Sequence, residues 1–489
     1  MRTFRLTLSS IDLAVSTAVA QPPQSQPSVG EARVVELANA LRLGRRDSLE
    51  AFIRRSFIDQ NVGAAEMTLF LNYYQGFFHL AQGAQISANN VTPYSAAAYW
   101  YSPLLEGWYT TSRMNVDSVA PHRILGMPRI SRMATPGDAP TPARVAMTEP
   151  ERLEEIGSYL KRVGDAGIFS GAIVIARDGK PVFAHAYGYA DREKKIPNTV
   201  DTPFLMGSMS KLFTGLAIGQ LVEQGKLSYD DPLAKFLPEF PDSESAKKIK
   251  IKHLLSHTSG LGSGPSMFNP DLIDNQTNIK GIVDAFDRKP PAFEPGTKFA
   301  YSNMGFVLLG RVIETVTGQD YYDYVQRNVF APVGATSASF PLLPKSGVAV
   351  VPMAYPYEPK WDNEGRLYAE SQLGKQVRRG SSAGGGVVSA LDLIKLSNAM
   401  RAGRIVKPET FQLHSSAKPE LGSNSYGYGF IAGPYYGRPF VGHNGRALGQ
   451  CTEFGELRDT PYTIVVLSNL EQDWCRPVAE KILRVLRPT

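Results

Sequence analysis

The pattern of apolar and polar positions divides the chain into two parts. From Ser28 to Leu80 the pattern is helical, whereas residues 85–130 carry short aromatic-rich runs with polar breaks, which are typical of strands. These segments predict a small α+β accessory unit over residues 29–134, in which no catalytic constellation is visible. A stretch rich in proline and threonine predicts a linker over residues 135–145.

The second part, residues 146–489, begins with an amphipathic helix that starts near Thr148. Two strand-like runs, 172–176 and 182–189, flank the residues Arg-Asp-Gly-Lys at 177–180, which is a strong hairpin signal. The pattern therefore predicts that this part opens with a helix and two paired strands.

Strand-like runs return near the end of the chain, at 439–442, 451–457 and 462–467, and a final helix is predicted over 477–486. The middle, residues 200–430, is mostly helical with long loops rich in glycine and proline. Strands at both ends of the part predict one antiparallel sheet flanked by helices, with a helical subdomain formed by the middle. The predicted fold class is therefore α/β (α+β).

Composition narrows the class of protein. Of 489 residues, 43% are hydrophobic and 20% charged, which excludes a disordered, collagen-like or polytopic membrane protein. The formal net charge is +6, without long basic runs, so nucleic acid is not an expected partner. No integral membrane span is expected either.

Metal-ligating residue types are sparse. The two cysteines cannot build a zinc finger or an iron–sulfur site, and the seven histidines show no His-x-x-x-His spacing. We therefore expect no metal and no cofactor. Cys451 and Cys475 could form a disulfide in an exported protein, but two reduced thiols fit the sequence equally well.

The first twenty residues resemble a secretory signal peptide. Arg2 precedes a short apolar stretch that ends in Ala-Val-Ala at positions 18–20, although Asp12 interrupts that stretch. Residues 1–20 are predicted as the signal peptide and 21–28 as a flexible linker. The expected location is exported, either periplasmic or secreted.

A candidate nucleophile comes from the Ser-x-x-Lys pattern, which occurs four times, as Ser158/Lys161, Ser208/Lys211, Ser245/Lys248 and Ser415/Lys418. Ser158 lies inside an amphipathic helix, Ser245 in a charged loop and Ser415 in a polar stretch. Only Ser208 follows a glycine and precedes a long apolar helix.

That position gives Ser208 and Lys211 distinct chemistry. Ser208 is expected at a helix N-terminus, where unpaired N–H groups favour a developing anion. Lys211 lies three residues on, on the same face of the helix. A buried lysine can lose its proton near neutral pH and act as the base for a serine.

Further motifs occur in a fixed order along the second part. Tyr301-Ser302-Asn303 precedes an apolar helix, His443-Asn444-Gly445 follows the strand-like run 439–442, and His253–Leu261 lies between Ser208 and Tyr301. Together with Ser208 and Lys211, these motifs resemble the serine β-lactamase and penicillin-binding protein superfamily. The resemblance covers residues 146–489. Within the superfamily, this sequence looks most similar to the class C-like branch, which includes DD-peptidases, D-aminopeptidases and carboxylesterases.

The resemblance implies roles for the residues of these motifs. Ser208 attacks a carbonyl to form an acyl-enzyme, and Lys211 and Tyr301 share the general acid–base work. Asn303, His443 and Gly445 bind substrate. The backbone N–H groups of Ser208 and Arg446 form the oxyanion hole. The segments 253–261 and 381–386 are expected to be structural loops near the site.

One departure and one competing motif bear on the function. His443 stands where many β-lactamases carry lysine, and a neutral imidazole anchors a substrate carboxylate less well than an ammonium. This difference favours an esterase or a peptidase over a β-lactamase. The predicted activity is that of a carboxylesterase-type hydrolase of small acyl esters, and the alternatives are a D-amino-acid peptidase, a DD-carboxypeptidase or a β-lactamase. Gly380-Ser381-Ser382-Ala383-Gly384 matches a nucleophile elbow, but it lacks the strand before it and the helix after it.

A hypothesis of a different class is a non-catalytic descendant whose pocket binds a ligand or a partner. The presence of Ser208, Lys211, Tyr301 and Asn303 together favours an enzyme, because a binding module has no chemical need for all four. The expected partner is a small ester or amide substrate, and the sequence indicates no protein partner.

Overall fold

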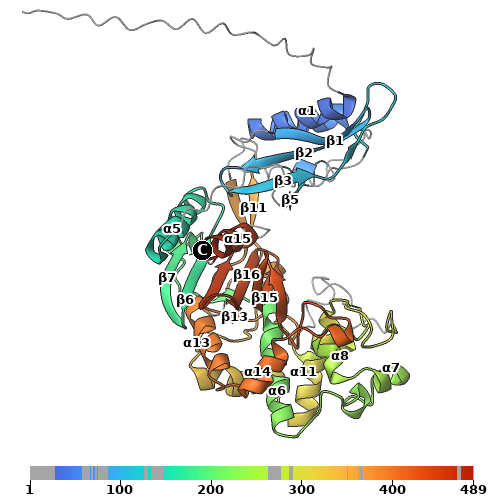
Figure 1. Cartoon of the computed structure of the whole chain (residues 1–489), viewed down its shortest axis with the longest axis vertical. Helices are drawn as coiled ribbons and strands as arrows, with labels where there is room; N and C mark the ends of the chain where they lie inside the picture. The colour runs from blue at the N-terminus through green and yellow to red at the C-terminus, as the bar shows by residue number, and fades with distance from the viewer. Residues whose placement is uncertain are drawn as a thin grey trace, which may run out of the picture.

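Figure 1 shows the computed structural model of the chain, coloured from the N-terminus to the C-terminus. The structure describes residues 28–57, 67, 70–71, 74, 86–125, 130–133, 147–262, 277–285, 290–349, 351–362, 367–470 and 475–487. The predicted signal peptide, the linker 21–28 apart from Ser28, and the linker 135–145 lie outside the described residues.

A six-stranded antiparallel sheet forms the centre of the second part, with the strand order β14-β15-β16-β17-β6-β7. Its strands are β6 (Gly171–Arg177), β7 (Lys180–Tyr187), β14 (Ile431–Tyr435), β15 (Arg438–Ala447), β16 (Gln450–Leu457) and β17 (Tyr462–Ser468). The strand β17 pairs with β6 in the register Val465↔Val174, so the two ends of this part meet inside one sheet.

Two layers of helices cover the sheet, and β17 shows how its side chains divide between them. Val465 and Leu467 pack into the core that contains α6 (Ser210–Glu223) and α13 (Ala390–Arg401), whereas Ile464 and Val466 pack toward α5 (Glu149–Asp165) and α15 (Cys475–Val485). This alternation follows from the pleat, which points successive side chains to opposite faces.

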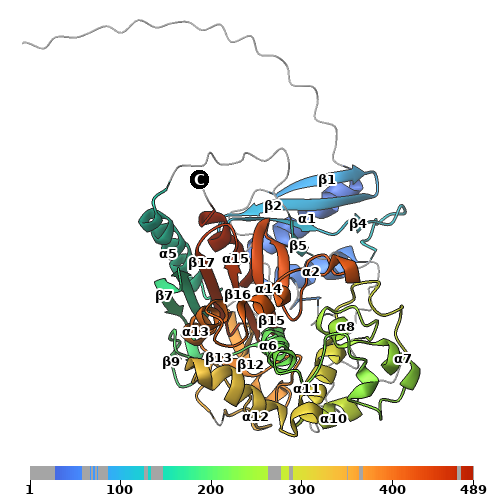
Figure 2. The same cartoon turned by 60° about the horizontal axis from the view of Figure 1, so that its bottom comes forward.

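The middle of the chain supplies the helical layer and a helical lobe beside it (Figure 2). Its helices are α6 (Ser210–Glu223), α7 (Ser243–Lys248), α8 (Ile251–Leu255), α10 (Ile279–Asp284), α11 (Asn303–Thr317), α12 (Tyr321–Val325), α13 (Ala390–Arg401) and α14 (Pro408–His414). Three small strand pairs complete it, β8 (Tyr189–Asp191) with β9 (Ile196–Pro197), β10 (Phe204–Leu205) with β13 (Val387–Val388), and β11 (Tyr357–Trp361) with β12 (Leu367–Ser371).

The N-terminal part contains two described helices and a second antiparallel sheet. The helices are α1 (Val29–Leu43) and α2 (Arg46–Ser56), and the strands are β1 (Ile86–Thr92), β2 (Ser95–Ser102), β3 (Gly107–Thr111), β4 (Met114–Asn115) and β5 (Ile130–Met133). The order is β1-β2-β3-β5, with β4 paired to β2. In Figure 1 this sheet lies beside α15, at the opposite end of the molecule from α7.

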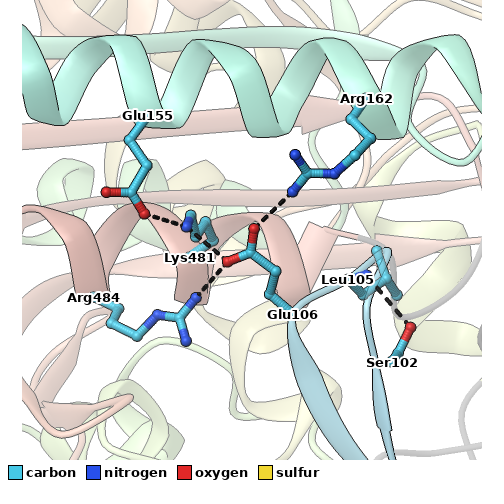
Figure 3. Close-up of polar contacts among 7 residues, drawn as sticks. All are labelled: Ser102, Leu105, Glu106, Glu155, Arg162, Lys481 and Arg484. Carbon is cyan, nitrogen blue, oxygen red and sulfur yellow. Dashed lines mark hydrogen bonds and ion pairs between the residues drawn. The ribbon is translucent and has the colours of Figure 1, made fainter. Parts of the chain in front are cut away.

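A charged cluster joins the N-terminal part to the layer formed by α5 and α15 (Figure 3). Glu106, in the turn between β2 and β3, accepts from Lys481 at 2.7 Å, Arg484 at 3.0 Å and Arg162 at 2.6 Å. Lys481 also pairs with Glu155 of α5. We call these five residues the Glu106 cluster. One hydrophobic core contains buried residues of both parts, so apolar packing accompanies the charged contacts.

The predicted fold class is confirmed, including the antiparallel sheet assembled from the two ends of the second part. The predicted hairpin is β6–β7, and its turn places Asp178 and Gly179 at φ of 49° and 76°. Two strands differ from the prediction. Residues 431–435 form β14 although they include Gly433 and Pro434, because the strand lies at an edge of the sheet, where a proline is tolerated.

The strand β15 is longer than the predicted run 439–442, because pairing with β16 continues to Ala447↔Gln450. His443 and Gly445 therefore lie within a strand rather than after one. Cys451 of β16 and Cys475, at the start of α15, form a disulfide, which decides between the two alternatives left open by the sequence. Within the described residues, no helix combines the length and the apolar character needed to cross a bilayer.

Candidate active site

Ser208 lies in a single 3₁₀ turn, η1 (Gly207–Met209), directly before α6. Its side chain is half-buried. Gly207 has a φ of 54°, and a Cβ added to it would lie 2.6 Å from the backbone nitrogen of Arg446. A glycine at this position therefore allows β15 to approach the residue before Ser208, while α6 directs the positive end of its dipole toward the serine.

Lys211 is fully buried in the first turn of α6 (0% exposed). Its Nζ donates to Asn303 Oδ1 at 2.8 Å and to the carbonyl oxygen of Ala383. The same nitrogen lies 4.8 Å from the centre of the Tyr301 ring and 5.6 Å from that of Phe306. Burial lowers the pKa of Lys211 well below its usual value, so the amine can lose its proton and accept another.

Tyr301 brings a phenol to the nucleophile candidate. Its ring is partly open to solvent (39% exposed), and its side chain hydrogen bonds to Ser208. Burial of the phenol raises the pKa of Tyr301 to about 12, against the lowering effect of that hydrogen bond. The phenol therefore keeps its proton at neutral pH and can pass it along the hydrogen bond.

Asn303 is held in place by the start of α11. Ser302 caps this helix, because its Oγ accepts from the Gly305 N–H at 3.1 Å and donates to the Gly262 carbonyl at 2.9 Å. The cap fixes the backbone between Tyr301 and Asn303. Asn303 can then present its amide oxygen to Lys211.

His257 packs against the segment that contains Tyr301 and Ser302, and the sequence did not indicate that role. Its ring lies 4.2 Å from that of Tyr301, and its Nδ1 accepts from the Ser302 N–H at 3.1 Å. Burial lowers the pKa of His257 well below its usual value, and the charge of Lys211 lowers it further. The imidazole is therefore neutral and acts as a packing support for Tyr301.

His443 lies on β15, fully enclosed (2% exposed). Its Nδ1 lies 2.6 Å from the Asn444 carbonyl oxygen and its Nε2 lies 2.8 Å from the Tyr426 hydroxyl. Because a carbonyl can only accept, Nδ1 carries the proton and Nε2 accepts from Tyr426. Burial lowers the pKa of His443 to about 3, so the ring is neutral at physiological pH. Tyr426 is a second residue of the site that could not be identified from the sequence.

Gly445 and Arg446 bring the backbone of β15 against the turn that carries Ser208. A Cβ added to Gly445 would lie 1.9 Å from the Met206 carbonyl oxygen, so only a glycine permits this approach. The contact places the backbone nitrogen of Arg446 beside Gly207 and the start of α6. The two backbone groups predicted as an oxyanion hole, from Ser208 and Arg446, therefore lie in neighbouring segments.

The loop Gly380–Gly386 lies on the buried side of the site. It supplies the Ala383 carbonyl to Lys211, and its Gly385 N–H donates to the Gly207 carbonyl at 3.0 Å. Ser382 is 0% exposed, and its Oγ has no hydrogen-bond partner among the described residues. A substrate carbonyl cannot reach this hydroxyl, which agrees with the rejection of the nucleophile-elbow motif.

The other Ser-x-x-Lys pairs lie elsewhere. Ser158 is exposed on α5. Ser245 lies on the short helix α7, not in the predicted loop, because Asp242 caps that helix, accepting from its backbone N–H and its hydroxyl. Ser415 follows α14, and the buried Lys418 is held by two backbone carbonyl oxygens.

Fold and site together define a class of protein. An antiparallel sheet under helices, with a serine, a buried lysine and a tyrosine gathered at the start of one helix, is typical of the serine β-lactamase and penicillin-binding protein superfamily. Residues 154–484, more than half of the chain, match the family described as Beta-lactamase. The chain belongs to this family, whose members are serine hydrolases.

Individual relatives agree with this assignment. The chain is 31% identical to "Putative penicillin-binding protein PbpX" of Bacillus subtilis over 58% of its own length and 66% of that protein. It is 28% identical to "Penicillin-binding protein 4*" of the same species over 65% of its length and 72% of that protein. The crystal structure of a penicillin binding protein from Bacillus halodurans superposes with a TM-score of 0.57 and 28% identity, over 68% of this chain and 100% of that chain.

Proposed function

We propose that this protein is a carboxylesterase-type serine hydrolase that forms an acyl-enzyme on Ser208 and prefers small, uncharged acyl esters. The observation that carries the proposal is a site in which a serine hydroxyl, a protonated phenol and a deprotonable buried lysine are gathered together. These are the groups that acyl transfer needs: a nucleophile, a proton acceptor and a proton donor.

In the proposed acylation, Ser208 Oγ attacks the ester carbonyl carbon while its proton moves to Lys211, directly or through the Tyr301 phenol. The carbonyl oxygen becomes an oxyanion, and the backbone N–H groups of Ser208 and Arg446 stabilise it. When the C–O bond breaks, the proton returns through Tyr301 to the leaving alkoxide. The products of this half are an alcohol and an acyl group on Ser208.

In the proposed deacylation, a water molecule attacks the acyl carbon and gives its proton to Lys211. A second oxyanion forms at the same two N–H groups, and the ester bond to Ser208 breaks. The proton on Lys211 then returns to Ser208 Oγ, releasing a carboxylic acid. Asn303 and Ala383 hold the Lys211 amine in both halves, because their oxygens accept its hydrogen bonds.

The preference for uncharged esters rests on the electrostatics of the site. Burial lowers the pKa of His443 to about 3 and that of His257 well below its usual value, so both imidazoles are neutral at pH 7. A substrate carboxylate would lose hydration without meeting a cation at either histidine. Neutral acyl chains do not incur that loss.

A second candidate function is acylation by D-amino-acid amides, D-peptides or β-lactams. It is favoured by the two Bacillus subtilis relatives described above, since both are named as penicillin-binding proteins. The two candidates share the acyl-enzyme and differ in the leaving group and in the charge of the substrate. A panel of p-nitrophenyl butyrate, D-phenylalanine amide and nitrocefin separates them, and we expect the highest kcat/KM for the ester.

The nucleophile is tested with a fluorophosphonate probe and mass spectrometry. We expect one covalent adduct, on the peptide that contains Ser208, and loss of both adduct and ester turnover in Ser208→Ala. Ser158→Ala is the matched control, because it alters an exposed serine of the same Ser-x-x-Lys pattern. An intact protein without an adduct on Ser208 would favour the non-catalytic binding protein.

We also propose that the protein is exported to the periplasm or beyond the cell. The support is the disulfide between Cys451 and Cys475, because structural disulfides persist in oxidising compartments. The test is fractionation of cells that express the full chain, together with N-terminal sequencing of the mature protein. A mature N-terminus at Gln21 in the exported fraction is expected, and an unprocessed protein in the cytoplasm would contradict it.

A further inference from the structure

A chain of hydrogen bonds lies behind the strand that carries His443. Glu453 of β16 is buried (3% exposed), and its Oε2 accepts from the Tyr435 hydroxyl at 2.6 Å. The same hydroxyl accepts from Asn444 Nδ2 at 2.9 Å. Asn444 and Glu453 are opposite each other in the β15–β16 register, so three neighbouring strands are linked on one face of the sheet.

Asn444 connects the hydrogen-bonded residues Glu453 and Tyr435 to the opposite face of the sheet, where the candidate site lies. Its side chain donates to the Tyr435 hydroxyl, and its backbone carbonyl accepts from His443 Nδ1 at 2.6 Å. Residue 445, next along the strand, is the glycine that lies against Met206. A shift of Asn444 therefore changes the orientation of the His443 ring and the position of the proposed oxyanion strand.

We propose that Glu453 is a positioning residue for the active site, which holds Asn444 through Tyr435 and so fixes the His443 ring. Its effect on catalysis rests on the proposed hydrolase function, but its effect on His443 does not. Glu453 itself does not touch the reacting atoms, since it lies on the far face of the sheet from His443.

The charge of Glu453 is poised to change near neutral pH. Burial raises the pKa of its carboxyl to about 7, against the lowering effects of the Tyr435 hydrogen bond, Arg476 and Arg446. The titratable and charged groups around it are Tyr435 and Tyr436 at the end of β14, Arg446 on β15, and Arg476 and Glu480 on α15. From the other neighbouring strand, β17, the residue opposite Glu453 is the apolar Val466.

Ionisation of Glu453 strengthens the chain of hydrogen bonds. A carboxylate accepts a phenol hydrogen bond more strongly than a neutral acid does. Asn444 is therefore held more firmly above pH 7 than below it. Because His443 itself stays neutral over this range, a change in its environment near pH 7 does not report its own protonation. Lys211 also acts on His443 through its charge, so the variant Glu453→Gln identifies which group is responsible.

The direct test follows the His443 imidazole by NMR in protein labelled with ¹⁵N-histidine, with the signal assigned by its loss in His443→Asn. We expect the His443 nitrogen shifts to move with a midpoint near pH 7 in the unaltered protein. Glu453→Gln, which keeps the shape and removes the ionisation, is expected to abolish that step. A His443 signal with the same step in Glu453→Gln would overturn the proposal.

The kinetic test measures kcat for p-nitrophenyl butyrate against pH. We expect a step near pH 7, with the higher kcat on the alkaline side, that disappears in Glu453→Gln. Tyr435→Phe breaks the link to Asn444, and we expect a fall in kcat of about fivefold at pH 8 with KM unchanged.

Glu456→Gln is the matched control, because Glu456 is also a buried carboxylate of β16 but lies on the other face, bonded to Ser397 at 2.7 Å. Its pH profile is expected to keep the step near pH 7. If the unaltered protein has no turnover and no fluorophosphonate adduct, the proposed function fails, and the NMR result still decides the role of Glu453. If turnover is present and Glu453→Gln keeps the step, the positioning role fails.

Discussion

Two lysines of this molecule are buried to a similar degree in opposite surroundings. Lys211, at the candidate site, is 0% exposed, and its nitrogen meets an amide oxygen, a backbone carbonyl and two aromatic rings. Lys481, between the N-terminal part and α5, is 4% exposed and meets the carboxylates of Glu106 and Glu155.

The surroundings decide the charge, because a buried ammonium is costly unless an anion accompanies it. Burial lowers the pKa of Lys211 well below its usual value. At the other site burial alone would raise the pKa of Glu106, but the hydrogen bond from Lys481 and the charges of Lys481, Arg484 and Arg162 together lower it. The contacts of Glu106 therefore favour its ionised form, whereas burial at the candidate site disfavours the ammonium form of Lys211.

Of these two lysines, only the one without a carboxylate beside it is suited to proton transfer. Lys211 is suited to accept a proton, and Lys481 is suited to hold elements together. The same substitution at both positions is therefore expected to have opposite consequences, for activity at one and for stability at the other.

Lys211→Met has the largest expected effect. Methionine fits among the Tyr301 and Phe306 rings but cannot accept a proton, so we expect kcat/KM for p-nitrophenyl butyrate to fall at least about 1,000-fold. The melting temperature is expected to stay the same or rise, because the buried amine is removed. Steady-state kinetics and calorimetry on the same preparation measure both.

Lys481→Met is the control for that prediction, and its kcat/KM is expected to stay close to that of the unaltered protein, because Lys481 contacts Glu106 and Glu155 and none of the described residues of the candidate site. An active Lys211→Met variant would show that another group accepts the Ser208 proton. An inactive but folded Lys481→Met variant would show that the Glu106 cluster is coupled to the site.

The site residues that could be predicted from the sequence are those that belong to short local motifs. Ser208 and Lys211 lie three residues apart at one helix start, and the glycine before Ser208 is visible in the sequence. The distant strand β15 was predicted in part, as the run 439–442, and its continuation to Ala447 was not predicted. The structure brings these segments together with Tyr301 and Asn303, while their catalytic roles stay predictions.

Contacts across long distances in the sequence could not be predicted in the same way. Lys211 donates to the backbone carbonyl of Ala383, and because every residue has such a carbonyl, the residue type does not indicate the contact. His257 belongs to a segment that was expected to be a structural loop, and only the tertiary fold places its ring 4.2 Å from that of Tyr301. Lys481 resembles a solvated residue of an amphipathic helix, and its burial arises because Glu106 and the N-terminal part cover it.

Lys481→Met is also expected to change the free energy of unfolding, which distinguishes Lys481 from Lys211. The substitution leaves Glu106 and Glu155 close together without the cation between them, and we expect a loss of about 3 kcal/mol in the free energy of unfolding. Urea unfolding followed by tryptophan fluorescence measures it. The double variant Lys481→Met/Glu106→Gln is expected to be less destabilised than the sum of the single variants, and strict additivity would contradict a direct interaction.

The pH dependence separates the two lysines further. Lys211 must be neutral to accept a proton, and its pKa is lowered, so activity is expected to fall on the acid side of a pKa below the usual lysine value. Below that pKa the neutral fraction decreases about tenfold per pH unit, so log kcat/KM is expected to approach a slope of one. A profile without an acid limb over the whole pH range in which the protein stays folded would argue against Lys211 as the base.

Acid acts on the Glu106 cluster by lowering the stability of the fold. It does not act through the cluster on the acid limb of the activity profile. Because the folded pKa of Glu106 is lowered, its contribution is complete above its ordinary pKa and is lost as pH falls through the lowered value. Unfolding monitored by fluorescence at each pH therefore distinguishes loss of the base from loss of the fold. In Glu106→Gln the acid limb of activity is expected to keep its midpoint.

The smallest expected effect is that of Arg484→Gln, at the rim of the Glu106 cluster. Arg484 contacts the same oxygen of Glu106 as Lys481, at 3.0 Å, but its side chain is 45% exposed whereas that of Lys481 is 5% exposed. Solvent screens an exposed pair, so we expect a loss of at most about 0.5 kcal/mol, further reduced in 0.5 M salt. Urea unfolding at two salt concentrations measures it. A loss as large as that of Lys481→Met would mean that charge number, and not burial, determines the strength of the cluster.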